Sequence, residues 1–354
     1  MVRRSAKPSE EIPETDRIEG YPHPRETFHL AGQGEALARA ARAIRSGRPP
    51  QGWLIGGPPG VGKATLAYRI ARYVLKYGTS ADGPADLDVP AGDPASIQIA
   101  AKSHPGLLVL KRGPNPETGR MMTVLAVDEI RRLTGFFGLT SGAGGWRVAI
   151  IDTADEMNDA AANALLKALE EPPPRALLML IANAPGRLLP TIRSRCQRLI
   201  LRPLPAADLD AELAAHVPDL SAEERSSVAQ LAGGSLGLAL QIADGEGLAI
   251  AKEADRLIDD AATPDIAALT ALADRIARMK DGLETLGEFL MLTLTDRIRH
   301  RARNDPPDLK PWMNVWEKLR DRFARANALH LEPRQTILSS ARALSEASRH
   351  GVLK

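Results

Sequence analysis

A glycine-rich loop that ends in a lysine is the first stretch of the sequence that could do chemistry. The loop follows an apolar segment, 53–55, and precedes a segment of helical periodicity, 64–77. A strand, a glycine-rich loop and a helix in this order surround phosphate oxygens with backbone N–H groups and a helix N-terminus. Lys63 would reach the outer phosphates. The pattern predicts a nucleotide-phosphate loop, and a chance glycine-rich turn is the alternative.

The position after the lysine lacks the hydroxyl that would bind magnesium. Ala64 stands where a Ser or Thr normally coordinates the metal ion. Thr65 lies one residue further on, about 100° around a helix, so its hydroxyl should not substitute. We therefore expect no magnesium-assisted hydrolysis, while the glycines and Lys63 leave phosphate binding an open question.

The pair of carboxylates that an active ATPase needs is also incomplete. Asp152 ends the apolar segment 148–151, where a carboxylate that organises magnesium would lie. The next position, which holds a water-polarising Glu in an active ATPase, is Thr153, and loss of a general base costs about 10²–10⁴-fold in rate. Asp155 and Glu156 follow, but a polar start to the next turn explains them better. The sequence indicates an ATPase that no longer turns over ATP.

Buried strands and amphipathic helices must position these residues. Apolar runs predict strands, and helical spacing of apolar residues predicts helices. The predicted strands are 53–55, 107–110, 148–151 and 177–182, and the predicted helices are 36–46, 64–77, 127–137 and 159–171. Asn183 ends the last of these strands, and a polar loop then carries Arg193, Ser194, Arg195 and Cys196. Alternating strands and helices predict an α/β domain with a parallel sheet.

Three runs carry a specific family resemblance. The runs are AAANALLKALEEPP (160–173), LLPTIRSRC (188–196) and GVGKATLA (60–67). They resemble the delta-prime subunits of the bacterial DNA polymerase III clamp loader, a family of AAA+ proteins. The recognisable part covers residues 28–240, and the remaining third fits in length and helical character.

The resemblance implies roles for particular residues. Arg195, in the Ser-Arg-Cys tip, would act in catalysis as an arginine finger that reaches the ATP of an adjacent motor subunit. Fingers of this kind are worth about 10³–10⁵ in rate. Arg193 is a weaker second candidate, and an ion pair or a closed surface loop is the alternative for Arg195. Asn183 takes the place of a γ-phosphate sensor, and Gly237 replaces an arginine that contacts nucleotide in active motors.

The candidate site therefore combines a degenerate nucleotide pocket with a donated arginine. We expect no residue to hold a metal ion. The candidate nucleotide-binding residues are Gly57, Gly60, Gly62, Lys63, Thr65, Asp152 and Asn183. No cofactor is required, although the glycines and Lys63 would still permit weak ATP or ADP binding. Many relatives hold a four-cysteine zinc site near 78–93, but this stretch has no cysteine, so we expect no zinc.

The resemblance also implies a three-domain AAA+ architecture. Residues 1–24, rich in Pro, Glu, Arg and Ser, are expected to be a disordered tail. An AAA+ P-loop domain (25–204), a small helical lid domain (205–245) and an all-α collar domain for oligomerisation (246–354) would follow. In the collar we expect the stripe of Leu283, Leu286, Phe289, Leu290 and Leu294 to be core and the basic run of Arg297, Arg299, Arg301 and Arg303 to be a solvated helix face.

The expected function is that of a stator, a subunit of the replicative clamp loader that does not hydrolyse ATP. It would help to load the sliding clamp onto primed DNA and would belong to the DNA polymerase III holoenzyme, a DNA-directed DNA polymerase complex. Its implied partners are the gamma/tau motor and delta subunits, the sliding clamp, and primed DNA through the complex.

Two other functions remain as alternatives. An active AAA+ motor ATPase of DNA replication or repair is disfavoured by Ala64 and Thr153. A small-molecule P-loop kinase would need several arginines in a substrate lid, which 206–245 does not resemble. Glu170 and Glu171 could be an acid–base pair, but a helix end before prolines explains them without chemistry.

Composition fits a globular protein of two or three domains. The 354 residues are 25% charged and 44% hydrophobic, and the formal charge of +2 argues against strong DNA binding by the whole molecule. The single cysteine excludes an intramolecular disulfide framework and fits a reducing compartment. No stretch approaches the roughly 20 apolar residues that span a bilayer, and no hydrophobic signal core is present. We expect a cytoplasmic protein without membrane contact.

Overall fold

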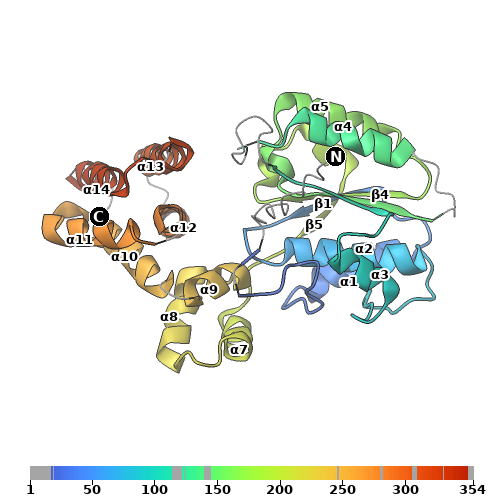
Figure 1. The fold of residues 1–354 in the computed structure, drawn as a ribbon, viewed down its shortest axis with the longest axis horizontal. Coiled ribbons are helices and arrows are strands. Elements are labelled where there is room, and N and C mark those ends of the chain that lie inside the picture. Colours follow the sequence, from blue (N-terminus) through green and yellow to red (C-terminus); the bar gives the residue numbers. More distant parts are fainter. Residues whose placement is uncertain are drawn as a thin grey trace, which may run out of the picture. The chain divides into compact units, whose positions relative to one another are not determined.

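The computed structural model describes residues 17–18, 20–113, 122, 124–138, 145–244, 247–279, 282–304, 309–329 and 331–349. The chain divides into two compact units (Figure 1). The α/β unit runs to Glu212 and includes Gly234–Leu238, and the helical unit comprises Leu213–Gly233 and the chain from Ala239 onward.

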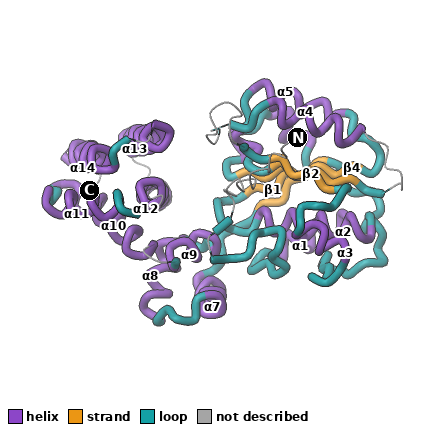
Figure 2. Tube along the Cα trace, in the orientation of Figure 1, coloured by secondary structure: helices purple, strands orange, loops and turns teal. Residues whose placement is uncertain are grey.

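A parallel sheet forms the centre of the α/β unit (Figure 2). Its strands are β1 (Gly52–Gly56), β2 (Leu107–Leu110), β3 (Arg147–Ile151), β4 (Ala176–Ala182) and β5 (Gln197–Ile200). Their order in the five-stranded sheet is β2-β3-β4-β1-β5, and every pairing is parallel. The central strand β4 and its neighbour β1 are buried along their whole length, which explains their unbroken apolar sequences.

Helices cover both faces of this sheet (Figure 1). One face packs against α1 (Gly34–Ile44), α2 (Lys63–Tyr77) and α3 (Pro94–Ala100), and the other against α4 (Val127–Gly138) and α5 (Asp159–Glu170). Helix α5 begins where the Asn158 side chain accepts a hydrogen bond from Ala161 N, and it ends just before three prolines. Two 3₁₀ turns, η1 (Ala154–Glu156) and η2 (Pro185–Arg187), and the short helix α6 (Pro190–Arg195) complete the polar edge segments.

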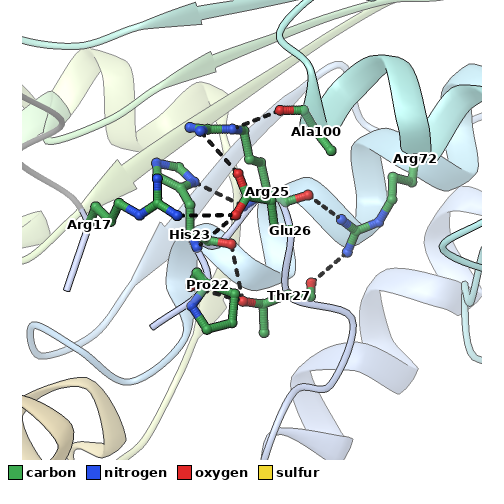
Figure 3. Close-up of polar contacts among 8 residues, drawn as sticks. All are labelled: Arg17, Pro22, His23, Arg25, Glu26, Thr27, Arg72 and Ala100. Atoms are coloured by element: carbon green, nitrogen blue, oxygen red, sulfur yellow. Dashed lines mark hydrogen bonds and ion pairs between the residues drawn. The ribbon is translucent and has the colours of Figure 1, made fainter. Parts of the chain in front are cut away.

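The segment before α1 is fastened to α2 and α3 by buried arginines (Figure 3). Arg72, which is 1% exposed, donates hydrogen bonds to the carbonyl oxygens of Arg25 (3.0 Å) and Thr27 (2.9 Å). Arg25 Nε reaches the carbonyl oxygen of Ala100 at 3.0 Å, and the buried His23 ring accepts from Arg25 N. The end of the expected tail 1–24 is therefore part of the α/β unit, while residues 1–16 and 19 lie outside the described residues.

The predicted fold class is confirmed, with two additions and one correction. The four predicted strands and four predicted helices all form, and 78–93 contains no helix or strand. Strand β5 and helix α3 were not predicted from the sequence. It placed Arg193–Arg195 in a loop, but these residues end α6, because Pro190 starts a helical turn and the buried Ile192 anchors it in the core.

The helical unit consists of helices that pack against one another. Besides η3 (Asp260–Ala262), they are α8 (Ala222–Ala232), α10 (Gly247–Asp259), α11 (Ile266–Ile276), α12 (Gly282–Asn304), α13 (Lys310–Leu329) and α14 (Pro333–Arg349). The predicted stripe on α12 is largely core, since Leu286, Phe289, Leu290 and Leu294 are buried. Arg297 forms ion pairs with Asp255 and Asp259 of α10, so it braces two helices of the unit.

The three-domain division of the sequence stays a prediction. Helices α7 (Ala206–His216) and α9 (Leu236–Ala243) of the expected lid are each divided between the two compact units. The expected break at 305–307 lies outside the described residues, between α12 and α13. Within the part of the chain that the structure describes, no helix is both long and apolar enough to cross a membrane.

Candidate nucleotide site and arginine tip

The parallel sheet brings the candidate nucleotide-binding residues to one edge. Strand β1 runs directly into the phosphate loop, and its last residue, Gly56, lies opposite Ala182 at the end of β4. Asn183 follows β4, and Asp152 follows the neighbouring β3. Because all these strands point the same way, the loop, Asp152 and Asn183 share the carboxyl edge of the sheet, where α/β proteins bind ligands.

The loop glycines are required by backbone geometry and close packing. Gly57, Gly60 and Gly62 all have positive φ angles, of 149°, 71° and 95°. A Cβ at Gly60 would lie 2.3 Å from Ser235 Oγ and 2.9 Å from Leu238 N. The loop thus keeps the glycine conformations of a phosphate cradle, but the start of α9 is packed directly against it.

Lys63 is folded back onto its own loop. Its ammonium donates a hydrogen bond to the carbonyl oxygen of Pro58 at 2.5 Å, and the residue is 6% exposed. Burial lowers the pKa of the Lys63 ammonium to about 8, against the opposing effect of the Asp152 and Asp155 carboxylates. A phosphate would have to draw this ammonium away from Pro58 O, which now accepts its hydrogen bond.

Three successive loop carbonyls are occupied by donors from the chain itself. Pro58 O accepts from Lys63, Pro59 O accepts from Ser235 Oγ at 2.8 Å, and Gly60 O accepts from Gly237 N at 2.9 Å. A Cβ at Gly237 would lie 2.9 Å from Gly60 Cα, so only glycine fits. Gly237 thus serves as a backbone contact to the loop.

The two residues after the lysine offer no exposed hydroxyl. Ala64 has none, and Thr65 is 9% exposed, packed within the buried stretch of α2. Thr65 is therefore a buried residue of α2. It follows Ala64, the position at which a metal-binding hydroxyl was expected.

Asp152 and Thr153 form a closed turn at the end of β3. Thr153 N donates to Asp152 Oδ1 at 2.9 Å, and Thr153 Oγ1 donates to Asp152 O at 2.8 Å. Thr153 holds a left-handed conformation, with φ 54° and ψ 51°, which is unusual for a β-branched residue. Its hydroxyl is thus turned onto the backbone, in a position where a water-polarising carboxylate would be needed.

Asp155 ties this turn to the end of β4. Its carboxylate accepts hydrogen bonds from the backbone N–H groups of Asn183 (3.2 Å) and Ala184 (2.7 Å). Glu156 pairs with Arg112 at 2.8 Å. Both acids therefore have structural partners. The exposed Asn183 is held at the site through its backbone.

Arg195 lies at the opposite edge of the sheet. Helix α6 leads into β5, whose first residue, Gln197, pairs with Trp53 near the start of β1. The phosphate loop begins at the other end of β1, about 13 Å away at 3.3 Å per residue. The Arg195 Nη2 atom pairs with Glu170 Oε1 at 2.9 Å, and Nη1 donates to Thr191 O at 3.1 Å. Arg195 is thus separated from the chain's own nucleotide site.

Arg193 and Cys196 flank this exposed tip in different ways. Arg193 is half-buried, and its Nε atom has no hydrogen-bond partner among the residues that the structure describes. Burial raises the pKa of the Cys196 thiol to about 11, so the single cysteine is a packing residue here. Arg195 is the exposed arginine of the tip, with 38% of its side chain accessible.

Two relationships at these sites could not be read from the sequence. The contact of Ser235 and Gly237 with the phosphate loop joins residues that are about 175 positions apart. The Glu170–Arg195 pair joins the end of α5 to the end of α6. The only sequence signal was indirect: Glu170 and Arg195 each lie in one of the runs that carry the family resemblance.

Sequence comparison matches the α/β part of the chain to known proteins. Residues 32–205 match the family model described as "DNA polymerase III, delta subunit". DNA polymerase III subunit delta' of Pseudomonas aeruginosa is 40% identical over 185 residues, covering 52% of each chain. The subunit delta' of Escherichia coli K12 is 33% identical over 205 residues, covering 58% of each chain. The match thus spans little more than half the length of these curated relatives.

More distant similarities point to related proteins. DNA polymerase III subunit gamma/tau of Mycobacterium bovis is 31% identical over 52% of this chain and 30% of its own length. Among solved structures, the chain is similar to a DNA polymerase III gamma subunit-related protein of Thermotoga maritima, with 18% identity and a TM-score of 0.38 over 90% of this chain and 100% of that chain. It is also similar to the RuvB Holliday junction branch migration motor of the same organism, with 17% identity and a TM-score of 0.42 over 90% of this chain and 92% of that chain. At these TM-scores the two structures carry no argument. The sequence matches show that residues 32–205, just under half of the chain, match the DNA polymerase III, delta subunit family model, and that this part is similar to delta' subunits.

Proposed function

We propose that this chain is a clamp-loader subunit that does not hydrolyse ATP and that donates Arg195 to the ATP site of a neighbouring motor subunit. The motor would be a gamma/tau subunit, and the assembly would also contain a delta subunit and load a sliding clamp onto primed DNA. The matched delta' relatives and the gamma/tau similarity support the assembly.

The separation of Arg195 from the phosphate loop carries the proposal. The arginine lies at the amino edge of the sheet and the loop at the carboxyl edge. An arginine that stabilises the charge on a transferred phosphate must touch that phosphate, so Arg195 can only serve a nucleotide held by another subunit. The alternative to a finger role is that Arg195 serves only in its ion pair with Glu170. Both side chains are substantially exposed, and exposed pairs contribute only about 0–1 kcal/mol to stability. Such a pair leaves the arginine available.

The state of the chain's own nucleotide site supports the absence of turnover. The magnesium hydroxyl and the general base are replaced by Ala64 and Thr153, and Lys63 is engaged by Pro58 O. In-line phosphoryl transfer depends on positioning and on electrostatic stabilisation by a metal ion and a lysine. Here the hydroxyl that would bind the metal ion is missing, and the lysine is hydrogen-bonded to a backbone carbonyl.

The first test measures nucleotide binding and turnover on the isolated protein with magnesium present. We expect no turnover, with weak ATP or ADP binding or none. Turnover at the rate of an ordinary AAA+ motor would overturn the proposal and favour an active ATPase of DNA replication or repair.

The second test uses the reconstituted complex with gamma/tau and delta subunits. The Arg195→Ala variant should lower the ATPase rate of the complex strongly, because a finger is worth about 10³–10⁵ at the site it serves. Arg198→Ala is the matched control, since Arg198 is an exposed arginine of the adjacent strand β5. An unchanged rate with Arg195→Ala would refute the donated finger.

A further inference from the structure

The backbone that carries Arg195 is already fixed by the α/β unit. Leu188 and Ile192, on the segment that follows β4, are buried in the core under α4 and α5. Asp155 accepts the backbone N–H groups of Asn183 and Ala184 where this segment begins. The position of the Arg195 Cα atom is therefore set by packing and backbone hydrogen bonds. Only the orientation of its long side chain is left to be determined.

We propose that Glu170 is the positioning residue that orients the Arg195 guanidinium for donation. Glu170 is the last residue of α5, which runs back across the sheet and ends near the amino edge. Its Oε1 atom lies 2.9 Å from Arg195 Nη2, while Thr191 O accepts from Nη1 at 3.1 Å. The guanidinium is thus held from both terminal nitrogens. This inference rests on the proposed function and names a residue that the proposed function does not require.

The hydrogen-bond capacity of arginine allows Glu170 to hold the side chain without blocking it. A guanidinium has five N–H donors in a planar fork. The contacts with Glu170 and Thr191 use two of them, so three remain for a phosphate. A carboxylate on one side of the fork and a phosphate on the other can be bound simultaneously. The negative carboxyl-terminal end of α5 also favours the cation at this place.

The pair with Glu170 should restrict the rotamers of the Arg195 side chain before it docks into the neighbouring ATP site. An unrestrained arginine side chain loses rotamer entropy when it inserts into a neighbouring site. A side chain held in the productive rotamer has already lost that entropy. Because misplacement of a reacting or stabilising group by about 1 Å can cost about 10²-fold in rate, the pair should act on the catalytic step of the motor.

The test uses Glu170→Ala in the reconstituted complex. We expect kcat of the motor ATPase to fall by up to about fivefold with little change in KM for ATP, because an exposed pair contributes about 0–1 kcal/mol and the finger acts in the transition state. Glu170→Asp, which keeps the charge, should restore part of the rate. Glu171→Ala is the matched control, since Glu171 is the next residue and is also exposed. Melting temperature and co-elution with the other subunits show that each variant folds and assembles.

A double-mutant cycle separates positioning from a general structural effect. In an Arg195→Ala background, Glu170→Ala should have no further effect on kcat, because there is no guanidinium left to orient. If Arg195→Ala lowers the rate but Glu170→Ala leaves it unchanged or raises it, the positioning role is wrong and the proposed function stands. If Arg195→Ala itself has no effect, the proposed function fails, and the positioning role fails with it.

Discussion

The backbone N–H of Gly237 donates to the carbonyl oxygen of Gly60 at 2.9 Å, so the start of α9 lies directly on the phosphate loop. The contact is possible because neither residue has a side chain: a Cβ on Gly237 would lie 2.9 Å from Gly60 Cα. A side chain at this position would push the two segments apart. The close packing of α9 on the loop therefore depends on glycine at position 237.

Gly237→Ala should destabilise the protein because the added methyl group has no room. Overpacking of this kind costs about 1–3 kcal/mol, which we expect to appear as a lower melting temperature. Gly92→Ala is the control, since a Cβ at Gly92 meets nothing within 4 Å and its φ is not positive. A melting temperature equal to that of the wild type for Gly237→Ala would mean that α9 does not press on the loop in solution.

Lys63→Met should stabilise the protein at neutral pH. The pKa of Lys63 is lowered from 10.5 to about 8 in the folded state, so the charged ammonium opposes folding. This penalty is complete below pH 8 and disappears as the pH rises toward 10.5. At about 1.4 kcal/mol per pKa unit it amounts to about 3 kcal/mol, and loss of the bond to Pro58 O offsets part of it.

Denaturant titrations of both proteins at pH 7 and pH 10 test this prediction. The advantage of Lys63→Met should be largest at pH 7 and small at pH 10. Lys76, on the same helix, is the control: its bond to Asp93 raises its pKa, so Lys76→Met should give no gain at pH 7. An advantage for Lys63→Met that does not depend on pH would show that the lysine is solvated in the folded protein.

Cys196 should be almost unreactive in the folded protein. Raising the thiol pKa from 9.0 to about 11 lowers the thiolate fraction at pH 8 about a hundredfold, and burial restricts access further. The rate of alkylation at pH 8, measured with and without guanidinium chloride, tests this. Similar rates in the folded and unfolded protein would contradict the buried position.

The sequence was most informative where one physical requirement decides the residue types. Strands β1 and β4 are buried on both faces, so they read as continuous apolar runs. The edge strand β5 has the sequence Gln-Arg-Leu-Ile, and only Leu199 is buried. This short run of polar and apolar residues cannot be distinguished from a loop sequence. Helix α6 is six residues long, too short for its periodicity to be detected.

The functional groups that the candidate nucleotide site lacks could be predicted from the sequence, but the geometry of the site could not. Ala64 and Thr153 lack particular functional groups whatever the fold does around them. The bond from Ser235 to Pro59 O and the pair of Glu170 with Arg195 depend on how distant segments pack. Single-sequence periodicity carries no information about such packing, so these contacts required the structure.

Thr153→Asn should stabilise the protein, because asparagine tolerates the left-handed conformation that Thr153 holds at φ 54°. Relief of strain at a β-branched residue is worth about 1 kcal/mol. Thr153→Val is the matched comparison: it keeps the branched side chain and removes the Oγ1 bond to Asp152 O, so it should be less stable than the wild type. Urea midpoints of the three proteins should therefore rank Asn above Thr and Thr above Val. If Asn ranks below Thr, the hydroxyl contact with Asp152 stabilises the turn more than the strained backbone destabilises it.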